Sequence, residues 1–518
     1  MRWTTVAGSS AADVPAATPD RDGARTPLAT LPWLGAAAAL AVAVFLVVHR
    51  SLIDDAYITM DYARTLGEHF RWGLTPFHTA NSATSPLNVL LLGAVTAVVR
   101  RPVLALGIVF TALNVLQMWG FLRLARAVGL SKVFAGLGFA VILLSPLMLS
   151  IVGMEMTLAI TLIVLLADAS ARGSAKTFGL LSGLLLLTRV DLLVFAVVLL
   201  LASRTLRRKV LWAVGCAVAI TLPWYVFSWF ALGALVPDTL VIKTVAGGGW
   251  GSWHFGNGPL LYLQTYFTAT ALTLIPALLG LLALAGWFLA RAWRFATFRG
   301  LGVIAAVGVA GLAHYLAYTL LAPPPFHWYF APSAGALAIV ACAGVASVGR
   351  NAARGSGPTR AWDADRLAAL ALPALLLLAD VGFAGTRDLP WTQSVIHTNW
   401  AEARQYAAIG RALQGEQGLV VSSPGEIGTL AYFCECDIVD MFSDRGAVLP
   451  LISQREAEAG PVMQQLLRLN FVNLDRDVAA TQPNAALSWR PGPASGPDSW
   501  PATSQWRGDG SFVLVRNP

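Results

Sequence analysis

Charged residues are scarce in this sequence. Only 12% of its 518 residues are Asp, Glu, Lys or Arg, whereas 56% are hydrophobic, and the mean hydropathy is +0.63. So few charges cannot cover the surface of an ordinary water-soluble protein. The formal net charge of +8 comes from short basic clusters between apolar runs, a distribution that indicates membrane topology and argues against a nucleic-acid partner. The composition predicts a helical protein that crosses a membrane several times.

Cysteine is also rare, and its four copies carry little information about the fold. Cys216 and Cys342 fall in apolar runs and are expected to be small core residues. Cys434 and Cys436 would lie on the same side of a strand, too close in sequence for an unstrained mutual disulfide. The pair is also too small a set of ligands for a zinc site.

Residues 1–30 are not expected to be a cleavable secretory signal. Residues 1–30 are small, polar and Pro-containing, without the apolar core that such a signal needs. We expect this segment to be a disordered cytoplasmic tail. The apolar run 31–48 is long enough to span a bilayer and has no small-residue cleavage site, so it is expected to remain as the first anchor.

Basic segments fix the predicted orientation of the chain. Three of them lie between apolar runs and are expected on the cytoplasmic side: 204–209, 291–299 and 350–366. Counting spans from these segments places the polar C-terminal region outside. The basic segments 123–132 and 172–176 are also expected on the cytoplasmic side.

The run 85–99 leaves two alternatives, because it is shorter than the roughly 20 residues of a usual spanning helix. If it crosses the membrane, either the basic loop 123–132 lies outside or Asp54 lies inside. If it dips in and returns, the charges fit except Arg100 and Arg101, which would lie outside, where arginines can also bind phosphate. We favour the second arrangement, which gives about 11 transmembrane helices.

The C-terminal region differs in composition from the predicted transmembrane domain, residues 31–386. Residues 387–518 contain longer polar stretches with Trp and Pro, and "GLVVSSPGEIGTLAYFCECDIVDM" has the pattern of a strand, a turn, a helix and a second strand. We expect a small extracytoplasmic α/β domain. No internal sequence repeat is evident, which weakens the interpretation as an inverted-repeat transporter.

Two adjacent carboxylates, Asp54 and Asp55, follow the first apolar run. Ionisable groups at the edge of a bilayer are expensive, so each is a candidate functional residue. Neighbouring carboxylates repel, and in a dry cleft the pKa of one rises, which suits a general base or a metal ligand. The alternative is a helix start, because acids in the first turn complement the helix dipole.

Asp54 would begin the helix "DDAYITMDYARTLGEH". Ile58, Tyr62 and Leu66 form an apolar stripe along it, which predicts a helix that lies on the membrane surface. Asp61 is then expected to face water.

Three further charged residues lie at the predicted outer ends of spans. Glu155, in "GMEM", begins a span, and either caps that helix or has a functional role. Arg189 and Asp191, in "TRVDL", either neutralise each other or allow the guanidinium of Arg189 to bind a lipid phosphate through its two-pronged donor geometry.

Two outer loops offer further candidate binding residues. The loop 237–260 contains Lys243, a glycine run, two tryptophans and His254, which suits either a mobile cover over a sugar phosphate or an ordinary interfacial connector. The turn "APPPFHWYFAP" contains His327 and Tyr329, which line a pocket or form part of an aromatic belt.

Taken in order, these segments resemble the GT-C superfamily of membrane-embedded glycosyltransferases. The resemblance rests on "DDAYITMDYARTL", "TSPLNVLLLG", "GMEMTLAI", "LLSGLLLLTRVDLL", "PPPFHWYFAP" and "GEIGTLAYF…DIVDM", and it covers most of residues 40–445. The sequence is most similar to bacterial relatives of protein O-mannosyltransferases, aminoarabinose transferases and actinobacterial arabinofuranosyltransferases.

The resemblance implies an outward-facing active site, a polyprenyl-phosphate sugar donor and an acid in the first outer loop that activates the acceptor. Asp54 matches that acid, Asp55 is its neighbour, and Glu155 resembles the acid of the second outer loop. "ANSATSPLN" lacks the glutamate and Trp of many relatives, and "TRVD" has Val where Pro is common. These departures bear on the acceptor more than on the reaction.

The expected reaction is inverting transfer of a sugar from polyprenyl phosphate to a hydroxyl group of an extracytoplasmic glycan, lipid or protein. Asp54 takes the proton, and Arg189, Lys243 or a divalent cation (Mg²⁺ or Mn²⁺) held by Asp54 and Glu155 stabilises the departing phosphate. The alternatives are a lipid-linked sugar flippase or transporter, and a non-catalytic subunit of an envelope-synthesis complex. A transporter predicts acids near mid-span, whereas these acids cluster at one face.

Overall fold

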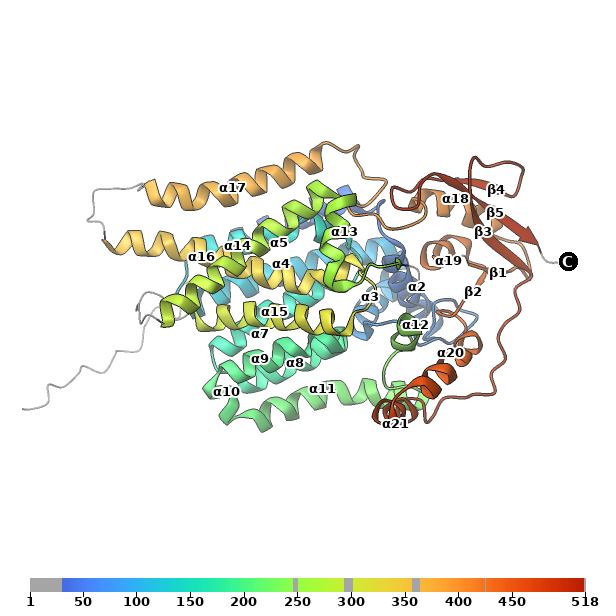
Figure 1. Ribbon diagram of the computed structural model, residues 1–518, viewed down its shortest axis with the longest axis horizontal. Coiled ribbons are helices and arrows are strands. Elements are labelled where there is room, and N and C mark those ends of the chain that lie inside the picture. Colours follow the sequence, from blue (N-terminus) through green and yellow to red (C-terminus); the bar gives the residue numbers. More distant parts are fainter. Residues whose placement is uncertain (1–29, 246–249, 293–300, 356–363, 424, 517–518) are drawn as a thin grey trace, which may run out of the picture.

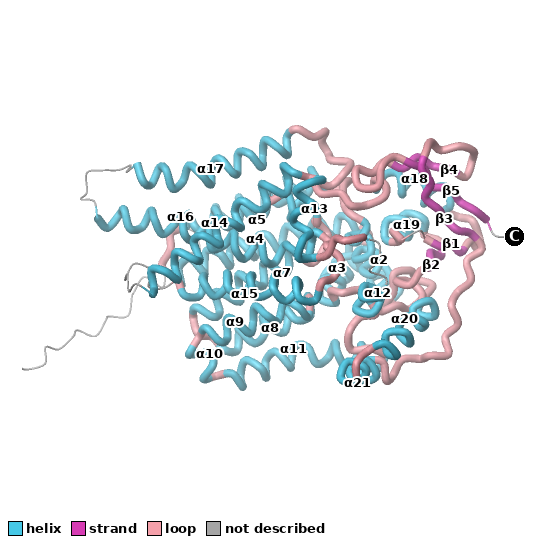
Figure 2. The backbone as a smooth tube through the Cα atoms, in the orientation of Figure 1, coloured by secondary structure: helices cyan, strands magenta, loops and turns pink. Residues whose placement is uncertain are grey.

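Most of the molecule is a helical bundle with a small sheet at one end. The bundle helices follow the long direction of the molecule (Figures 1 and 2). We call the end that carries the sheet the domain end. The computed structural model describes residues 30–245, 250–292, 301–355, 364–423 and 425–516, so residues 1–29 of the predicted N-terminal tail lie outside the described residues.

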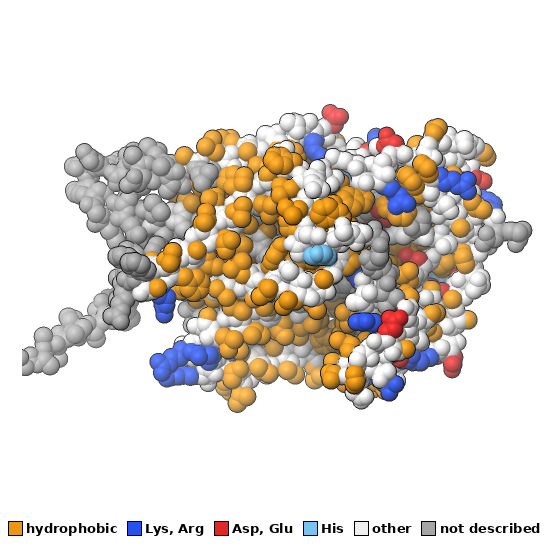
Figure 3. Space-filling view, in the orientation of Figure 1, with side chains coloured by type: hydrophobic (Ala, Val, Ile, Leu, Met, Phe, Trp, Pro, Cys, Tyr) orange, Lys and Arg blue, Asp and Glu red, His pale blue; other side chains and the backbone are white. Residues whose placement is uncertain are grey.

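Mostly apolar helices of 5 to 27 residues make up the bundle. They are α1 (Leu31–Val48), α3 (Pro86–Val99), α4 (Pro102–Val128), α5 (Lys132–Leu144), α6 (Pro146–Ser150), α7 (Met156–Ala171), α8 (Ala175–Thr188), α9 (Leu193–Ala202), α10 (Arg204–Arg208), α11 (Val210–Ala231), α14 (Phe267–Ala292), α15 (Gly302–Leu321), α16 (Ala331–Gly355) and α17 (Ala364–Gly385). The 3-10 helices η2 (Val190–Leu192) and η6 (His327–Phe330) precede α9 and α16. Apolar side chains are spread over the face of the bundle that Figure 3 shows.

Six helices in the described part of the chain are long and apolar enough to cross a membrane, judged by length and composition. They are α1, α4, α11, α14, α15 and the segment His327–Ser347. Several other helices of the bundle are apolar but shorter, with 10–17 residues. The protein is therefore a multi-span membrane protein, and the count of about 11 spans stays a prediction, as does the re-entrant course of 85–99.

Small residues let the bundle helices approach closely. A Cβ atom on Gly179 of α8 would lie 2.1 Å from the Ala213 carbonyl oxygen of α11. A Cβ atom on Gly280 of α14 would lie 1.9 Å from the Leu337 carbonyl oxygen of α16. Only glycine fits at either place, as is common where membrane helices pack backbone to backbone.

The end of the bundle opposite the sheet is basic. Helix α10 and its neighbours place Arg204, Arg207, Arg208 and Lys209 there, where Lys and Arg side chains gather (Figures 1 and 3). The charge distribution of the bundle is therefore asymmetric along its long axis.

Shorter elements occupy the domain end. Helices α2 (Asp54–His69), α12 (Thr239–Val245) and α13 (Gly258–Thr265) and the 3-10 helix η4 (Phe255–Asn257) come from the connections between bundle helices. The C-terminal region adds α18 (Ala403–Leu413), β1 (Val420–Ser422), α19 (Gly428–Cys434), β2 (Asp437–Val439), α20 (Arg445–Glu458), α21 (Pro461–Asn470), β3 (Ala485–Pro491), β4 (Ser499–Ala502) and β5 (Gly510–Arg516).

The five strands form one mixed sheet in the order β2-β1-β3-β5-β4. β1 is parallel to both β2 and β3, whereas β5 is antiparallel to β3 and β4. The β1–α19–β2 unit is the strand, turn, helix and strand that the sequence pattern predicted. The domain boundary at residues 386 and 387 stays a prediction.

Helix α2 is enclosed by protein, so the prediction that its apolar stripe lies on the membrane surface is wrong. Ile58 and Leu66 pack against a core cluster shared with the C-terminal region, and Tyr62 is fully buried. Asp61 is also buried instead of facing water, and its carboxylate accepts a hydrogen bond from Arg64 at 3.2 Å. The sequence could not show that other elements cover this stripe: Ile58 meets Gly428 of α19, and Leu66 meets Gly93 of α3.

The disulfide between Cys434 and Cys436 contradicts the expectation for these residues. We assumed an extended strand, but Cys434 ends α19, and Glu435 adopts a left-handed conformation with φ of 54°. The backbone turns between the two cysteines, which brings their Cα atoms within 5.1 Å.

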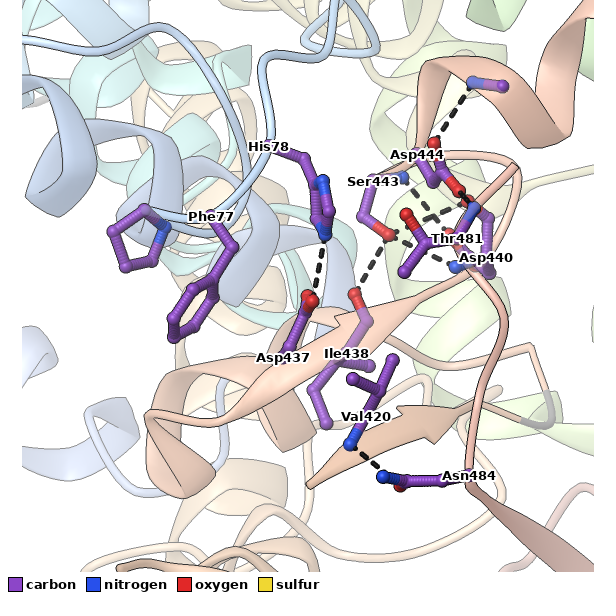
Figure 4. A network of polar contacts seen from close by, with 12 residues as sticks. Phe77, His78, Val420, Asp437, Ile438, Asp440, Ser443, Asp444, Thr481 and Asn484 are labelled. Atoms are coloured by element: carbon purple, nitrogen blue, oxygen red, sulfur yellow. Dashed lines mark hydrogen bonds and ion pairs between the residues drawn. The ribbon is translucent and has the colours of Figure 1, made fainter. Parts of the chain in front are cut away.

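An ion pair joins the segment between α2 and α3 to the sheet. His78 points to Asp437 of β2, with Nε2 and Oδ2 2.8 Å apart (Figure 4). The hydrogen bond to Asp437 raises the pKa of His78. Next to this pair, Asp444 caps α20 and accepts a backbone hydrogen bond from Thr481 at 2.6 Å.

Candidate active site

A cavity of about 150 Å³ lies at the domain end, where the bundle meets the C-terminal region. The first turn of α2, the start of α7 and helix α12 each contribute charged residues to its wall. The charged residues lining it are Asp54, Asp55, Glu155 and Lys243. Residues 82–85, Phe326, Gly425 and Ile427 complete much of the wall. Acids 100 positions apart in the sequence thus share one polar chamber.

Asp54 is tied to the backbone of the C-terminal region. Its Oδ2 accepts hydrogen bonds from the N–H groups of Ile427 and Gly428, both at 3.1 Å. Its Oδ1 accepts one from the N–H of Thr429 at 2.7 Å. Burial raises the pKa of Asp54, and these backbone donors act in the opposite direction. The Asp54 carboxylate therefore binds the backbone N–H groups at the start of α19, and it also forms part of the cavity wall.

Asp55 is less enclosed than Asp54. Burial raises its pKa to about 6, while Lys243 lowers it and the negative charges of Asp54 and Glu155 raise it. An acid with a pKa of about 6 is ionised at neutral pH and can still accept a proton readily. Its position and its pKa suit a general base.

Arg189 joins three groups beside the cavity. Its guanidinium donates to Glu155 and Asp191, each at 2.9 Å, and to the Tyr318 hydroxyl at 2.8 Å. It also lies over the Tyr329 ring, 5.1 Å from the ring centre. Local pairing with Asp191 is present, and the guanidinium also reaches the chamber residue Glu155. The binding of a lipid phosphate by Arg189 stays a prediction. Glu155 is the N-cap residue of α7, but its carboxylate is directed to Arg189.

Two residues of this network escaped the sequence analysis. His314 Nε2 lies 3.1 Å from Asp191, and its Nδ1 lies 3.0 Å from the Ser333 hydroxyl. Tyr318, one helical turn after His314, holds Arg189. A histidine within the apolar run of α15 was the signal that could have identified them, because ionisable groups inside membrane helices usually have partners.

Lys243 is held beside Tyr329. Its ammonium lies 3.2 Å from the Tyr329 hydroxyl. Burial favours the neutral amine, but interactions with Tyr329 and Asp55 outweigh that effect and raise the pKa of Lys243. Lys243 therefore stays charged and is the only cation among the described residues that line the cavity.

The two predicted histidines lie away from the cavity wall. His254 is exposed, and its ring accepts a hydrogen bond from the N–H of Gly256 at the start of η4. His327 is buried, and its ring nitrogens have no hydrogen-bond partner within the described residues. Four residues of the predicted mobile loop, 246–249, lie outside the described residues.

An apolar groove of about 380 Å³ runs along α14, α15 and α16. Its wall is formed by Leu, Ala and aromatic side chains, including Phe330 and Tyr315, and His327 lies among them. Residues 326–330 separate the groove from the chamber, because Phe326 lines the chamber whereas Phe330 lines the groove. A long apolar ligand and a polar chamber can therefore meet at this segment.

The residues of the chamber do not fit a divalent cation well. Within the described residues, no group of three or more His, Cys, Asp or Glu side chains comes together as a donor set. Glu155 is already bonded to Arg189, and Asp54 to backbone N–H groups. We therefore derive no step through a metal ion.

Solved structures share this architecture. ArnT from Cupriavidus metallidurans, bound to undecaprenyl phosphate, matches with a TM-score of 0.55 and 15% identity over 94% of this chain and 98% of that chain. The same protein in its apo state gives a TM-score of 0.53 and 14% identity, with coverage of 94% and 98%. The Archaeoglobus fulgidus oligosaccharyltransferase gives a TM-score of 0.50 and 13% identity, with coverage of 90% and 70%.

The chain therefore shares its fold with ArnT and with the oligosaccharyltransferase, in agreement with the GT-C fold that the sequence resemblance implied. No protein-family model and no curated protein matches the sequence, so the similarity rests on the structure. A further structure of the Archaeoglobus oligosaccharyltransferase contains zinc and sulfate.

Proposed function

We propose that this protein is an inverting glycosyltransferase that moves a sugar from a polyprenyl-phosphate donor to an extracytoplasmic hydroxyl group. The observation that carries the proposal is the chamber in which Asp55, Glu155 and Lys243 meet. A base and a cation in one small chamber are the two groups that such a transfer needs. The acceptor is a glycan, lipid or protein of the cell envelope.

The domain end is the extracytoplasmic end in this proposal. The opposite end carries Arg204, Arg207, Arg208 and Lys209, and basic loops remain on the cytoplasmic side. The chamber then opens on the side where lipid-linked sugars meet acceptors outside the cell. The N-terminus lies in the cytoplasm.

We assign the base to Asp55, although the sequence alone favoured Asp54. Each oxygen of Asp54 already accepts backbone hydrogen bonds, whereas Asp55 is more accessible and has a pKa of about 6. Asp55 takes the proton of the acceptor hydroxyl as the acceptor oxygen forms a bond to the anomeric carbon. The bond from that carbon to the phosphate oxygen breaks, and the negative charge on the departing polyprenyl phosphate is stabilised by Lys243.

Arg189 acts through its neighbours in this mechanism. Its bonds to Glu155 and Asp191 fix the start of α7, and the stacked Tyr329 ring holds the hydroxyl that contacts Lys243. Asp54 orients α19 against α2. These residues are positioning groups, whereas Asp55 and Lys243 contact the reacting atoms.

The apolar groove along α14, α15 and α16 is proposed to hold the isoprenoid chain of the donor. Its aliphatic lining excludes water and suits a long hydrocarbon. The Cupriavidus structure with undecaprenyl phosphate, which shares the fold, supports this class of donor. A phosphate joined to a chain in the groove could reach the chamber past residues 326–330.

Turnover by the purified protein tests the proposal. The protein, reconstituted in vesicles, is given a polyprenyl-phosphate sugar with a labelled sugar, together with an envelope acceptor fraction, and the released polyprenyl phosphate is measured. Asp55→Asn should lower the rate about a hundredfold or more, because a general base contributes on that scale. Protease resistance of the C-terminal region should not change in this variant.

Asp54→Asn is the matched comparison. Its amide nitrogen would face backbone N–H donors, so both the rate and the protease resistance should fall. Near-native turnover in Asp55→Asn would remove Asp55 from the base role. If the wild-type protein transfers no sugar but moves intact lipid-linked sugar between leaflets, the transporter alternative replaces the enzyme.

A further inference from the structure

Helix α21 has a buried face that joins it to the chamber. Leu467 and, just beyond the helix, Phe471 pack into a hydrophobic cluster with Val241 and Ile242 of α12 and Ile452 of α20. Helix α12 carries Lys243. The cluster therefore packs α21 against the helix that carries the chamber cation Lys243.

Hydrogen bonds hold α21 at the domain end of α11. The Asn470 side-chain oxygen accepts from the N–H of Val236 at 2.8 Å. The Trp229 indole of α11 donates to the Leu469 carbonyl oxygen at 3.1 Å. Figure 1 shows α21 beside the end of α11 and nearly end-on, so its axis crosses the direction of the bundle helices.

A second face of α21 is apolar and exposed. Val462, Leu466 and Leu469 are 77%, 54% and 51% exposed, and their spacing places them on one side of the helix. Gln465 and Arg468 are also exposed, and the helical repeat puts them together on an adjacent side. The exposed surface of α21 is thus divided into an apolar strip and a polar strip.

The apolar strip continues the surface of a spanning helix. Phe227 and Phe230 are exposed in the last two turns of α11, at the end of that helix that contacts α21. Further exposed apolar residues precede them along α11. A surface of this kind on a spanning helix faces lipid. Leu469 of the strip is hydrogen-bonded through its backbone to Trp229 in the same end of α11, and α21 lies across the direction of the bundle, as an interfacial helix does (Figure 1).

We propose that α21 docks on the outer leaflet of the bilayer. Val462, Leu466 and Leu469 enter the boundary between headgroups and acyl chains, Gln465 and Arg468 remain among the headgroups and water, and the buried face holds α20 and α12. The C-terminal region is thereby fixed against the membrane at a second place, away from the contact between α2 and α19. The occupant of the strip is lipid.

This docking also bears on the chamber, and that part rests on the proposed function. Through the cluster of α12, α20 and α21, the membrane surface sets the position of α12 and hence of Lys243. The cation that meets the donor phosphate is then held at the level of the lipid headgroups, where that phosphate resides.

Depth-dependent quenching tests the docking without reference to catalysis. Single cysteines are introduced as Leu466→Cys and Leu469→Cys in a Cys216→Ser background, labelled with an environment-sensitive fluorophore and reconstituted in phosphatidylcholine and phosphatidylglycerol vesicles. Gln465→Cys and Arg468→Cys are the matched controls on the same helix. Brominated acyl chains should quench the first pair several-fold more than the controls, whereas aqueous iodide should quench the controls more.

Equal quenching of all four sites by iodide would overturn the proposal, because the strip would then face water. Protection of Leu466→Cys and Leu469→Cys from both quenchers, with cross-linking between copies, would assign the strip to a second copy of the chain and also overturn it.

A functional comparison separates this inference from the proposed reaction. Leu466→Glu should lower transfer several-fold by lifting α21 and α12, while Gln465→Glu should not. If the quenching pattern holds and Leu466→Glu transfers normally, docking stands and its link to Lys243 fails. If no variant or wild-type protein transfers sugar, the quenching result still decides the docking.

Discussion

Two adjacent aspartates have different tasks because their surroundings differ. Asp54 meets three backbone N–H groups, which fix its carboxylate in place and counteract the rise in its pKa that burial causes. Asp55 is partly exposed to the chamber, near a lysine and a second acid. One residue therefore orients a helix, and its neighbour is available for proton transfer.

The pH dependence of transfer should reflect Asp55. Its pKa is raised from an ordinary value of 3.8 to about 6, and the base must be ionised to act. The rate should therefore be constant above neutral pH and fall about tenfold between the plateau and pH 5. Initial rates at saturating donor measure this limb, and a rate that stays flat down to pH 4 would exclude titration of Asp55.

Removing the neighbouring cation should shift that limb. Lys243 lowers the pKa of Asp55 by favouring its charged form, so Lys243→Gln should move the acid limb to higher pH as well as lower the plateau rate. Lys243→Arg, which retains the charge, should leave the limb near its original position. A limb unmoved in Lys243→Gln would show that the two groups do not interact.

Arg189 should be important for stability as well as for activity. Arg189→Gln leaves Glu155 and Asp191 without their shared buried cation, and such a loss costs about 3 to 5 kcal/mol. The thermal unfolding midpoint of Arg189→Gln in detergent should drop clearly. The midpoint of Arg189→Lys should lie between those of the wild-type protein and Arg189→Gln, because lysine keeps the charge but lacks the planar fork. An unchanged midpoint in Arg189→Gln would mean that water replaces these bonds.

The sequence predicted the charged residues of the site better than their roles. Asp55, Glu155, Arg189 and Asp191 could be identified because each is a charge at the end of an apolar run, and Lys243 because it is a cation in a long outer loop with a glycine run. The role of Asp54 could not, since its three hydrogen-bond donors lie more than 370 residues later in the chain.

At the scale of elements, the contact between α2 and α19 joins the bundle to the C-terminal region. Gly428 opens α19 directly against α2, where a Cβ atom would lie 2.4 Å from the Asp54 carbonyl oxygen and 2.6 Å from the Ile58 N–H nitrogen. Both neighbours are backbone atoms and cannot move aside easily. The absence of a side chain at this position is therefore what permits Asp54 to reach the start of α19.

Gly428→Ala should separate these two helices. The expected results are faster proteolysis of the C-terminal region and a several-fold lower transfer rate. Gly460→Ala is the matched control, because the surroundings of Gly460 are open and its φ is −63°. Equal protease resistance in both variants would show that the contact tolerates a methyl group.

Elements were predictable where their pattern is local. The apolar runs predicted the spanning helices, and the short strand, turn and helix signals predicted β1, α19 and β2. The surroundings of α2 were not predictable, because an apolar stripe looks the same whether lipid or another helix covers it. The Cys434–Cys436 disulfide was missed because the left-handed turn at Glu435 has no clear sequence signal.

At the scale of the whole molecule, the chamber lies at one end of a bundle whose other end is basic. The overall class followed from composition and charge, because few charges and basic loops are general consequences of a bilayer. The strand order of the sheet and the convergence of acids from separate loops required coordinates, since both depend on contacts between distant segments.

Cysteine labelling in intact cells tests the proposed orientation. An exposed cysteine introduced as Asp509→Cys, at the domain end, should react with a membrane-impermeant maleimide, whereas Lys209→Cys, after α10, should react only after the cells are opened. The reverse pattern would place the chamber in the cytoplasm and remove the basis for an extracytoplasmic acceptor.

The structure of the protein with bound polyprenyl phosphate tests the central claim most directly. The isoprenoid chain should lie in the groove along α14, α15 and α16. The phosphate should lie within hydrogen-bond distance of the Lys243 ammonium and face the Asp55 carboxylate across the space for a sugar. A phosphate bound at the basic end of the bundle, or a chamber closed to the groove, would contradict it.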